Sequence, residues 1–172
     1  MKRILMLLPA LPVVFGLLAT LSGRTALQQR QPVAAAAEFK VMRAEALADL
    51  EQKLHPKGKQ DLITSAGKQT QMYLQHERDR HNEAEVHDAA DDYHFVLEGT
   101  AVYTLGGRLE GAREKESGEW RGGRIVGGQQ VELKKGDIIF VPRGTPHQRS
   151  TKGRQLSMML IKVFATPITS GN

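Results

Sequence analysis

The segment of residues 136–147 reads GDIIFVPRGTPH and combines three features that restrict the fold. Residues 138–141 are an uninterrupted apolar run, which is typical of a strand covered on both faces. The stretch Pro142–Gly144 then has the composition of a tight turn. His147 follows at the start of the next expected strand. We therefore predict a buried strand, a turn and a histidine delivered to the sheet, with Phe140 among the covered side chains.

The chain on both sides of this segment has the same β character. Residues 70–77 alternate with a period of two, and the alternation places His76 on the inward side. Glycine-rich turns separate further short strand candidates, which are expected at 84–86, 93–97, 100–105, 130–133, 137–141 and 156–164. Many short strands joined by such turns predict an all-β sandwich or barrel, which we assign to residues 67–172.

Residues 27–66 precede this β region and are predicted to form a linker and a helix. Apolar residues recur at helical spacing from Phe39 to Leu54, and Pro56 ends the pattern. We expect this short N-terminal helix to pack against the strands and to have no chemical role.

The first 26 residues have the pattern of a secretion signal. Lys2 and Arg3 form a basic start, and residues 4–23 carry no charge. Small residues offer cleavage points near residue 26 or as late as residue 37. We therefore predict an exported protein, periplasmic or extracellular, that has no membrane association after cleavage. The alternative is an uncleaved membrane anchor, although the prolines at positions 9 and 12 would interrupt its helix.

Length and charge exclude several classes of protein. The 172 residues suit one domain, and a content of 40% hydrophobic and 25% charged residues is that of a globular chain. The formal charge is +5, but Lys2, Arg3 and Arg24 in the leader contribute three of these charges. The small remainder argues against a nucleic-acid partner. With no cysteine, the fold depends on its core alone.

The segment 136–147 matches the pattern G-x5-P-x-G-x2-H, and the chain therefore resembles the cupin superfamily. The first cupin signature, roughly H-x-H-x(3,4)-E-x6-G, is matched less closely. Anchoring it on Gly99 puts Asp92 at the acidic position, His87 at the second histidine and Glu85 where the first histidine would be. The resemblance extends over about residues 72–164.

The resemblance implies an antiparallel jelly-roll barrel whose interior holds a divalent metal or a small ligand. It implies that His87, His147, Asp92 and Glu85 are the metal ligands, and a set of nitrogen and oxygen donors suits Mn, Fe, Ni, Co or Zn. Strand geometry adds that Glu85 and His87 share one face of a strand. Both carboxylates have an alternative role as solvated groups at the barrel mouth.

Four further residues are expected to line the pocket: His94, His76, Phe140 and Met158. For His94, a hydrogen-bonded core histidine is the alternative. The mixed-charge segment between Gly99 and Gly136 is expected to be a solvated hairpin or mobile loop. The alternative for this segment is a lid that brings Trp120 and Arg121 toward an anionic ligand.

These observations predict an exported small cupin that binds a divalent metal, a small polar molecule, or both, and is a metal-dependent oxygenase, isomerase or lyase. Two alternatives stay open: a non-catalytic ligand-binding module, and a protein with a vestigial pocket that acts through its surface. No catalytic residue is identified. The expected partners are a small-molecule ligand and a second copy of the chain in a homodimer.

Overall fold

The structure is a computed structural model that describes residues 39–165. The predicted leader at 1–26 and the late cleavage region up to residue 37 lie outside the described residues. Contacts divide the chain into Met1–Lys40 and Val41–Asn172, and the fold below is that of the second unit. Within residues 39–165, no helix combines the length and apolar character needed to cross a membrane.

One helix, α1 (Ala44–Leu54), and one turn of 3-10 helix, η1 (Ala66–Lys68), accompany twelve strands. The strands are β1 (Gly58–Thr64), β2 (Thr70–Arg78), β3 (Glu85–His87), β4 (Ala90–Leu105), β5 (Arg108–Glu110), β6 (Arg113–Glu116), β7 (Glu119–Arg121), β8 (Arg124–Val126), β9 (Gln129–Lys134), β10 (Ile138–Val141), β11 (His147–Ser150) and β12 (Gln155–Phe164).

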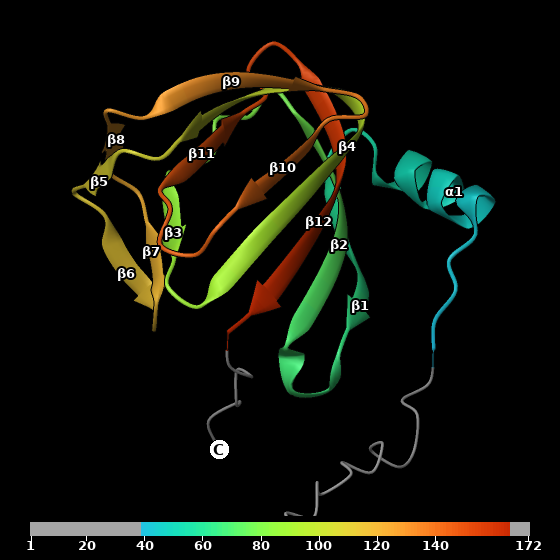
Figure 1. The fold of residues 1–172 in the computed structure, drawn as a ribbon. Coiled ribbons are helices and arrows are strands. Elements are labelled where there is room, and N and C mark those ends of the chain that lie inside the picture. The colour runs from blue at the N-terminus through green and yellow to red at the C-terminus, as the bar shows by residue number, and fades with distance from the viewer. Residues whose placement is uncertain (1–38, 166–172) are drawn as a thin grey trace, which may run out of the picture. The chain divides into compact units, whose positions relative to one another are not determined.

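The strands form two facing antiparallel layers that share the long strand β4 (Figure 1). The first half of β4 pairs with β12 and β10, and β12 pairs in turn with β2 and β1. The second half of β4 pairs with β9 and β11, and β3, β7 and β6 continue that layer. This arrangement confirms the predicted all-β jelly roll with one short helix.

Gly99 lies where β4 passes from one layer to the other. Its φ is +78°, which is in the left-handed region that favours glycine. A Cβ at this position would also overlap the carbonyl oxygen of Gln155 on β12. The bend therefore requires glycine for two reasons, conformation and close approach.

The interior between the layers has an apolar end and a polar end. Near the bend, where Leu156 pairs with Gly99, an apolar cluster fills the space with buried residues such as Tyr103 and Met158. At the other end of the same strand pair, Lys162 lies opposite Asp92. The charged residues of the barrel interior thus lie at one end, and the apolar core fills the other.

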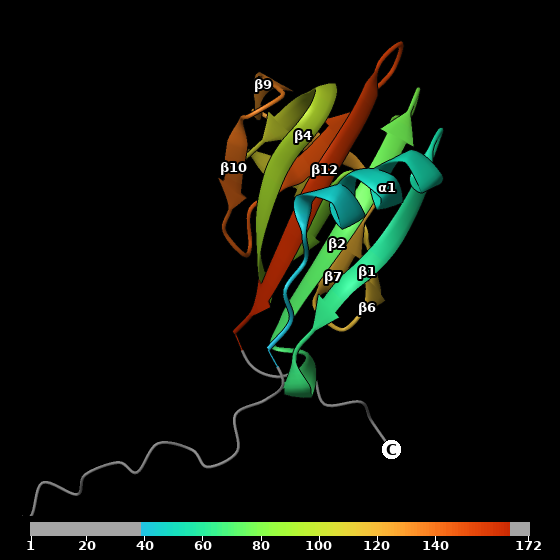
Figure 2. The ribbon, with the colours of Figure 1, turned by 90° about the vertical axis from the view of Figure 1, so that its right-hand side faces the viewer.

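The helix α1 packs outside the barrel, on the side of β1 and β2 (Figure 2). Strand β1 was not among the predicted strands, because its sequence GKQDLIT lacks an apolar pattern. Its pairing with β2 gives it a place in the sheet. The sheet therefore begins at Gly58, within the segment that we assigned to linker and helix.

Strand β10 differs from the prediction that both of its faces are covered. Ile139 and Val141 are buried, whereas Ile138 and Phe140 are 62% and 51% exposed. The Phe140 ring contacts the ring of Tyr93 on the outer face, with centroids 4.8 Å apart. A continuous apolar run can therefore belong to a strand with only one face in the core.

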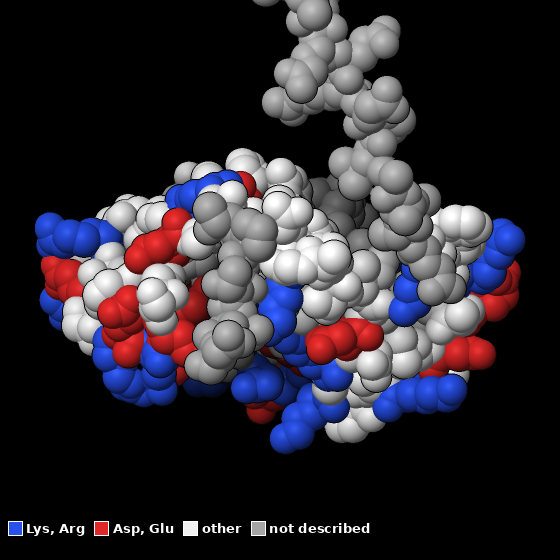
Figure 3. Space-filling view, turned by 90° about the horizontal axis from the view of Figure 1, so that it is seen from below, with Lys and Arg blue, Asp and Glu red and all other residues white. Residues whose placement is uncertain are grey.

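The mixed-charge segment between Gly99 and Gly136 forms strands β5 to β8, and β6 and β7 make a hairpin, which was one of the two forms expected for it. Strand β7 pairs with β3, which places Arg121 opposite Glu85 and Glu119 opposite His87. On the face of the molecule that Figure 3 shows, acidic and basic side chains are interspersed.

Candidate metal centre and adjoining cavity

Three neighbouring strands bring the four predicted ligands together. Strand β3 carries Glu85 and His87, β4 carries Asp92, and β11 begins with His147. Because β11 lies between β4 and β3, His147 pairs directly with Glu85. One ligand atom from each of Glu85, His87 and His147 lies within 4.8 Å of those of the other two.

The distances between the donor atoms suit a single ion. His147 Nε2 is 3.2 Å from Glu85 Oε1, and His87 Nε2 is 3.4 Å from Asp92 Oδ2. The separations from His87 Nε2 to Glu85 Oε2 and from His147 Nε2 to Asp92 Oδ2 are both 3.9 Å. Donor atoms about 2.1 Å from one metal ion lie roughly 3–3.5 Å apart, so small side-chain movements would complete this set.

The two imidazoles are oriented by hydrogen bonds on their outer nitrogens. His87 Nδ1 is 2.6 Å from Glu119 Oε2, and His147 Nδ1 is 3.0 Å from the carbonyl oxygen of Thr145. Both acceptors are oxygens, so each Nδ1–H donates and each Nε2 faces the cluster. Neither Nε2 makes a hydrogen bond, although both are buried. Metal-bound histidines are typically held in this way by an oxygen on the second ring nitrogen.

The field at the centre of the cluster favours a cation. Burial alone would lower the pKa of His87, but the carboxylates of Asp92 and Glu119 raise it to about 9. The same negative charge that holds a proton on His87 would attract a metal ion in its place. Metal binding here must therefore release that proton.

Both carboxylates of the cluster are ionised and paired with cations. Burial alone would raise their pKa values, but the facing imidazoles and cations hold the pKa of Glu85 and of Asp92 well below the usual range. Arg121 donates to Glu85, and Lys162 Nζ lies 2.9 and 3.0 Å from the two oxygens of Asp92. Both carboxylates therefore face the two imidazoles as charged groups, at similar distances.

Of the four expected pocket residues, His94 and Met158 lie inside the barrel behind the cluster. Burial lowers the pKa of His94 to about 4, so its ring is neutral. His94 Nδ1 is 2.9 Å from the Tyr103 hydroxyl, and Nε2 is 3.7 Å from Asp92 Oδ2. The Tyr103 hydroxyl is in turn 3.6 Å from the sulfur of Met158. His94 thus supports Asp92, and neither His94 nor Met158 lines the cavity.

The other two expected pocket residues lie elsewhere. Phe140 is on the outer face of β10. His76 is buried, but on the opposite face of β2 from the cavity-lining residues Tyr73, Gln75 and Glu77. Its ring stacks on that of His55 at the end of α1, with centroids 3.7 Å apart. The predicted inward face of β2 was therefore wrong by one residue, because its apolar side packs outside the barrel.

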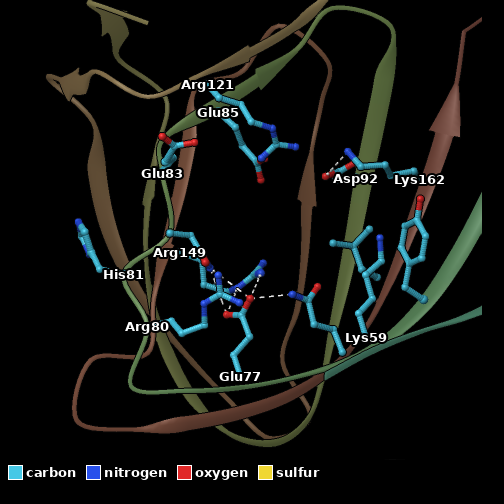
Figure 4. A pocket seen from close by; sticks show the side chains of 14 residues that line it. Lys59, Glu77, Arg80, His81, Glu83, Glu85, Asp92, Arg121, Arg149 and Lys162 are labelled. Atoms are coloured by element: carbon cyan, nitrogen blue, oxygen red, sulfur yellow. Dashed lines mark hydrogen bonds and ion pairs between the residues drawn. The ribbon is translucent and has the colours of Figure 1, made fainter. Parts of the chain in front are cut away.

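A cavity of about 480 Å³ adjoins the cluster, and Glu85 and Asp92 belong to its wall (Figure 4). The cations of its lining are Lys59, Arg80, Arg121, Arg149 and Lys162. The acids are Glu77, Glu83, Glu85 and Asp92. Only Tyr73 and Leu160 add substantial apolar surface to this lining, so the cavity suits a polar ligand.

Sequence reasoning named Arg121 only as part of an alternative lid, and it missed several other residues that control this site. Glu119 and Arg121 reach it only because β7 pairs with β3, more than 30 residues away in the chain. Glu77 and Arg149 form a buried ion pair in the cavity wall. A usable signal was Lys162, the lone cation in the mostly apolar run LSMMLIKVF of β12.

Comparisons with known proteins support the fold. No protein-family model and no curated protein matches the sequence. A solved structure from Bacillus halodurans covers 81% of this chain and 88% of its own, with 19% identity and a TM-score of 0.51. Another, from Thermus thermophilus, covers 73% and 98%, with 17% identity and a TM-score of 0.50.

A cupin superfamily protein from Desulfitobacterium hafniense is similar over 64% of this chain and 79% of its own, with 20% identity and a TM-score of 0.45. Identities of this size show the fold alone.

Proposed function

Because the chain has the fold of the cupins, we propose that it binds a divalent metal ion on Glu85, His87 and His147, with Asp92 beside them, and acts on a small polar molecule in the adjoining cavity. Two imidazoles and one or two carboxylates suit Mn, Fe, Ni, Co or Zn.

The observation that carries this proposal is the pair of buried Nε2 atoms on His87 and His147. Each lies 3.2 to 3.4 Å from a carboxylate oxygen without an aligned hydrogen bond, and each belongs to a ring whose other nitrogen is already bonded to an oxygen. A metal ion between them would bond to both Nε2 atoms and to the carboxylates that face them, and would take the place of the proton on His87.

The residues around the cluster have distinct roles in this proposal. Glu119 and the Thr145 carbonyl fix the tautomers of the two imidazoles. Arg121 and Lys162 keep Glu85 and Asp92 ionised, so the carboxylates are ready to act as ligands. A bound ion would supply Lewis acidity toward a carbonyl, carboxylate or hydroxyl oxygen of the substrate. An oxygenase, isomerase or lyase reaction is compatible with this chemistry.

A second function is favoured by one specific observation. Arg121 and Lys162 already balance the charges of Glu85 and Asp92, so the cluster can be neutralised without an ion. A non-catalytic module that captures a small polar ligand without metal would have this property.

Metal-dependent stabilisation distinguishes the two functions. Untagged protein is treated with a chelator, and its melting is followed with and without added Mn, Fe, Co, Ni or Zn. A metal at 100 times its Kd should add roughly 2.7 kcal/mol of stability, which corresponds to a rise on the order of 10 °C in a domain of this size.

His87→Gln and His147→Gln should lose most of this rise, whereas a matched control, His55→Gln, should keep it because His55 is exposed and outside the cluster. If no metal changes the melting of the wild-type protein, the metal-dependent function is rejected and the metal-free binding module takes its place.

We also propose, on the sequence of residues 1–26 alone, that the protein is exported. Mass spectrometry of the protein from its native host should find a chain that begins between about residues 22 and 37. An intact Met1 in a soluble cytoplasmic fraction would contradict export.

A further inference from the structure

The cavity beside the cluster is lined by several cations. Arg121 and Lys162 reach into it from opposite sides, each beside a carboxylate of the cluster (Figure 4). Lys59 is a third, with Nζ 3.5 Å from the centroid of the Tyr73 ring. Burial and the nearby charges of Lys162 and Arg121 lower the pKa of Lys59, despite the opposing charge of Asp61. The three cations therefore line the same cavity.

The charge balance of the cavity favours an anionic ligand. Its lining contains five cations and four acids, an excess of one positive charge. Of these cations, Arg149 is committed to Glu77 by two hydrogen bonds. A divalent ion shared by Glu85 and Asp92 would add two positive charges while the proton leaving His87 removes one, and it would weaken the hold of these carboxylates on Arg121 and Lys162.

The wall near Glu77 offers hydrogen-bond acceptors. Gln75 Nε2 donates to Glu77 Oε1 at 2.7 Å, and Asn82 Nδ2 donates to the same carboxylate at 3.1 and 3.2 Å. Because a carboxylate only accepts, both amides must turn their nitrogens toward Glu77. Their carbonyl oxygens then remain as acceptors for hydroxyl groups in the cavity.

We propose that the ligand of this cavity is a small hydroxylated carboxylate, whose carboxylate is bound by Lys59, Arg121 and Lys162 and whose hydroxyls are bound by Gln75 and Asn82. This inference deepens the proposed function, because it names the substrate class of the same site. Charge-assisted hydrogen bonds to the three cations would supply most of the selectivity.

Calorimetric titration of the full-length protein, with and without bound metal, tests this proposal. The probes are lactate, tartrate and gluconate, each beside the alcohol in which CH2OH replaces the carboxylate: propane-1,2-diol, threitol and sorbitol. At least one carboxylate should bind roughly tenfold or more tightly than its alcohol. Lys59→Gln should reduce this preference severalfold, since Arg121 and Lys162 remain, whereas Lys135→Gln, which alters an exposed lysine paired with Glu98 outside the cavity, should retain it in full.

The outcomes separate this inference from the proposed function. Because Lys59 is not among the metal ligands, Lys59→Gln should still bind metal. Metal binding without any preference for the carboxylates would overturn the inference and leave the metal site standing. Carboxylate binding that depends on Lys59 in a protein that binds no metal would reject the metal-dependent function and keep the ligand class. Inorganic phosphate that binds as tightly as the best carboxylate would also overturn the inference, since the cavity would then select charge alone.

Discussion

Replacing Glu77 should test the role of the buried ion pair in the cavity wall. Glu77 is 1% exposed and Arg149 is 9% exposed. Arg149 Nε and Nη2 lie 2.9 and 2.7 Å from the two carboxylate oxygens. Burial alone would raise the pKa of Glu77, but the hydrogen bonds from Arg149 and Asn82 lower it overall, so both partners are charged. Glu77→Gln should leave the guanidinium buried without its counter-charge.

Breaking a buried pair from one side typically costs about 3–5 kcal/mol, because the remaining charge keeps its desolvation penalty. Urea unfolding should show this loss as a lower midpoint with an unchanged slope. The matched control is Glu132→Gln at the exposed pair with Arg154, whose Nη1 is 3.0 Å from Glu132 Oε1. The control should cost at most about 1 kcal/mol.

Replacing both buried partners should separate pairing from packing. Glu77→Met with Arg149→Met removes both charges and should be more stable than either single variant. If Glu77→Gln unfolds at the same urea concentration as Glu132→Gln, the pair contributes no more than a surface salt bridge, and this reasoning is refuted.

Three further outcomes are expected. The folded-state pKa of Glu77 lies below its ordinary value of about 4.3. The stability that ionised Glu77 contributes is therefore present above about pH 4.3 and is lost as the pH falls through the folded-state pKa. When unfolding is measured at decreasing pH, Glu77→Gln should lose less stability than the wild-type protein. In thermal melts, Gly99→Ala should destabilise the protein far more than Gly136→Ala, because a Cβ at Gly99 overlaps the Gln155 carbonyl. A Cβ at Gly136 meets no atom within 4 Å, so this variant should lose only the roughly 1–2 kcal/mol that a positive φ costs an alanine. Phe140→Ala should cost about 1–2 kcal/mol, less than the roughly 3–5 kcal/mol of a buried phenylalanine, and a larger loss would show that the ring is covered.

The pattern of short strands predicted an all-β fold, and the resemblance to the two cupin signatures predicted the jelly roll and grouped the four clustered residues. The segment 136–147 contains a strand, its turn and the histidine in one continuous stretch, so the local sequence placed His147 at the start of a strand, and the resemblance assigned it to the cluster. Glu85 and His87 lie on β3, and Asp92 and Gly99 lie on the next strand, β4, so their spacing is also a local feature of the sequence.

Patterns of apolar residues failed where the barrel interior is polar. In β2 the cavity side carries Gln75 and Glu77, while the apolar Leu74 and the buried His76 face outward beneath the helix. An alternation rule that assigns apolar residues to the inside therefore selects the wrong face. In β10 the run 138–141 gave no alternation at all, so it could not show that one face is exposed.

The sequence also gave no information on which distant strands pair with each other. Glu119 orients His87, and Arg121 pairs with Glu85, only because β7 lies beside β3. The mixed charges of that segment are typical of a solvated surface, and nothing local distinguishes the two residues that turn toward the site. The contacts of Glu119 with His87 and of Arg121 with Glu85 can be inferred only when the pairing of β7 with β3 is known.

X-ray absorption spectroscopy of the metal-loaded protein is the measurement that tests the metal site most directly. The proposed site predicts two imidazole nitrogens and one or two carboxylate oxygens at about 2.0–2.2 Å from the ion. In His147→Gln the imidazole contribution should fall to one ring, or the ion should be absent. A spectrum with only oxygen ligands and no imidazole scattering in the wild-type protein would contradict a metal site on His87 and His147.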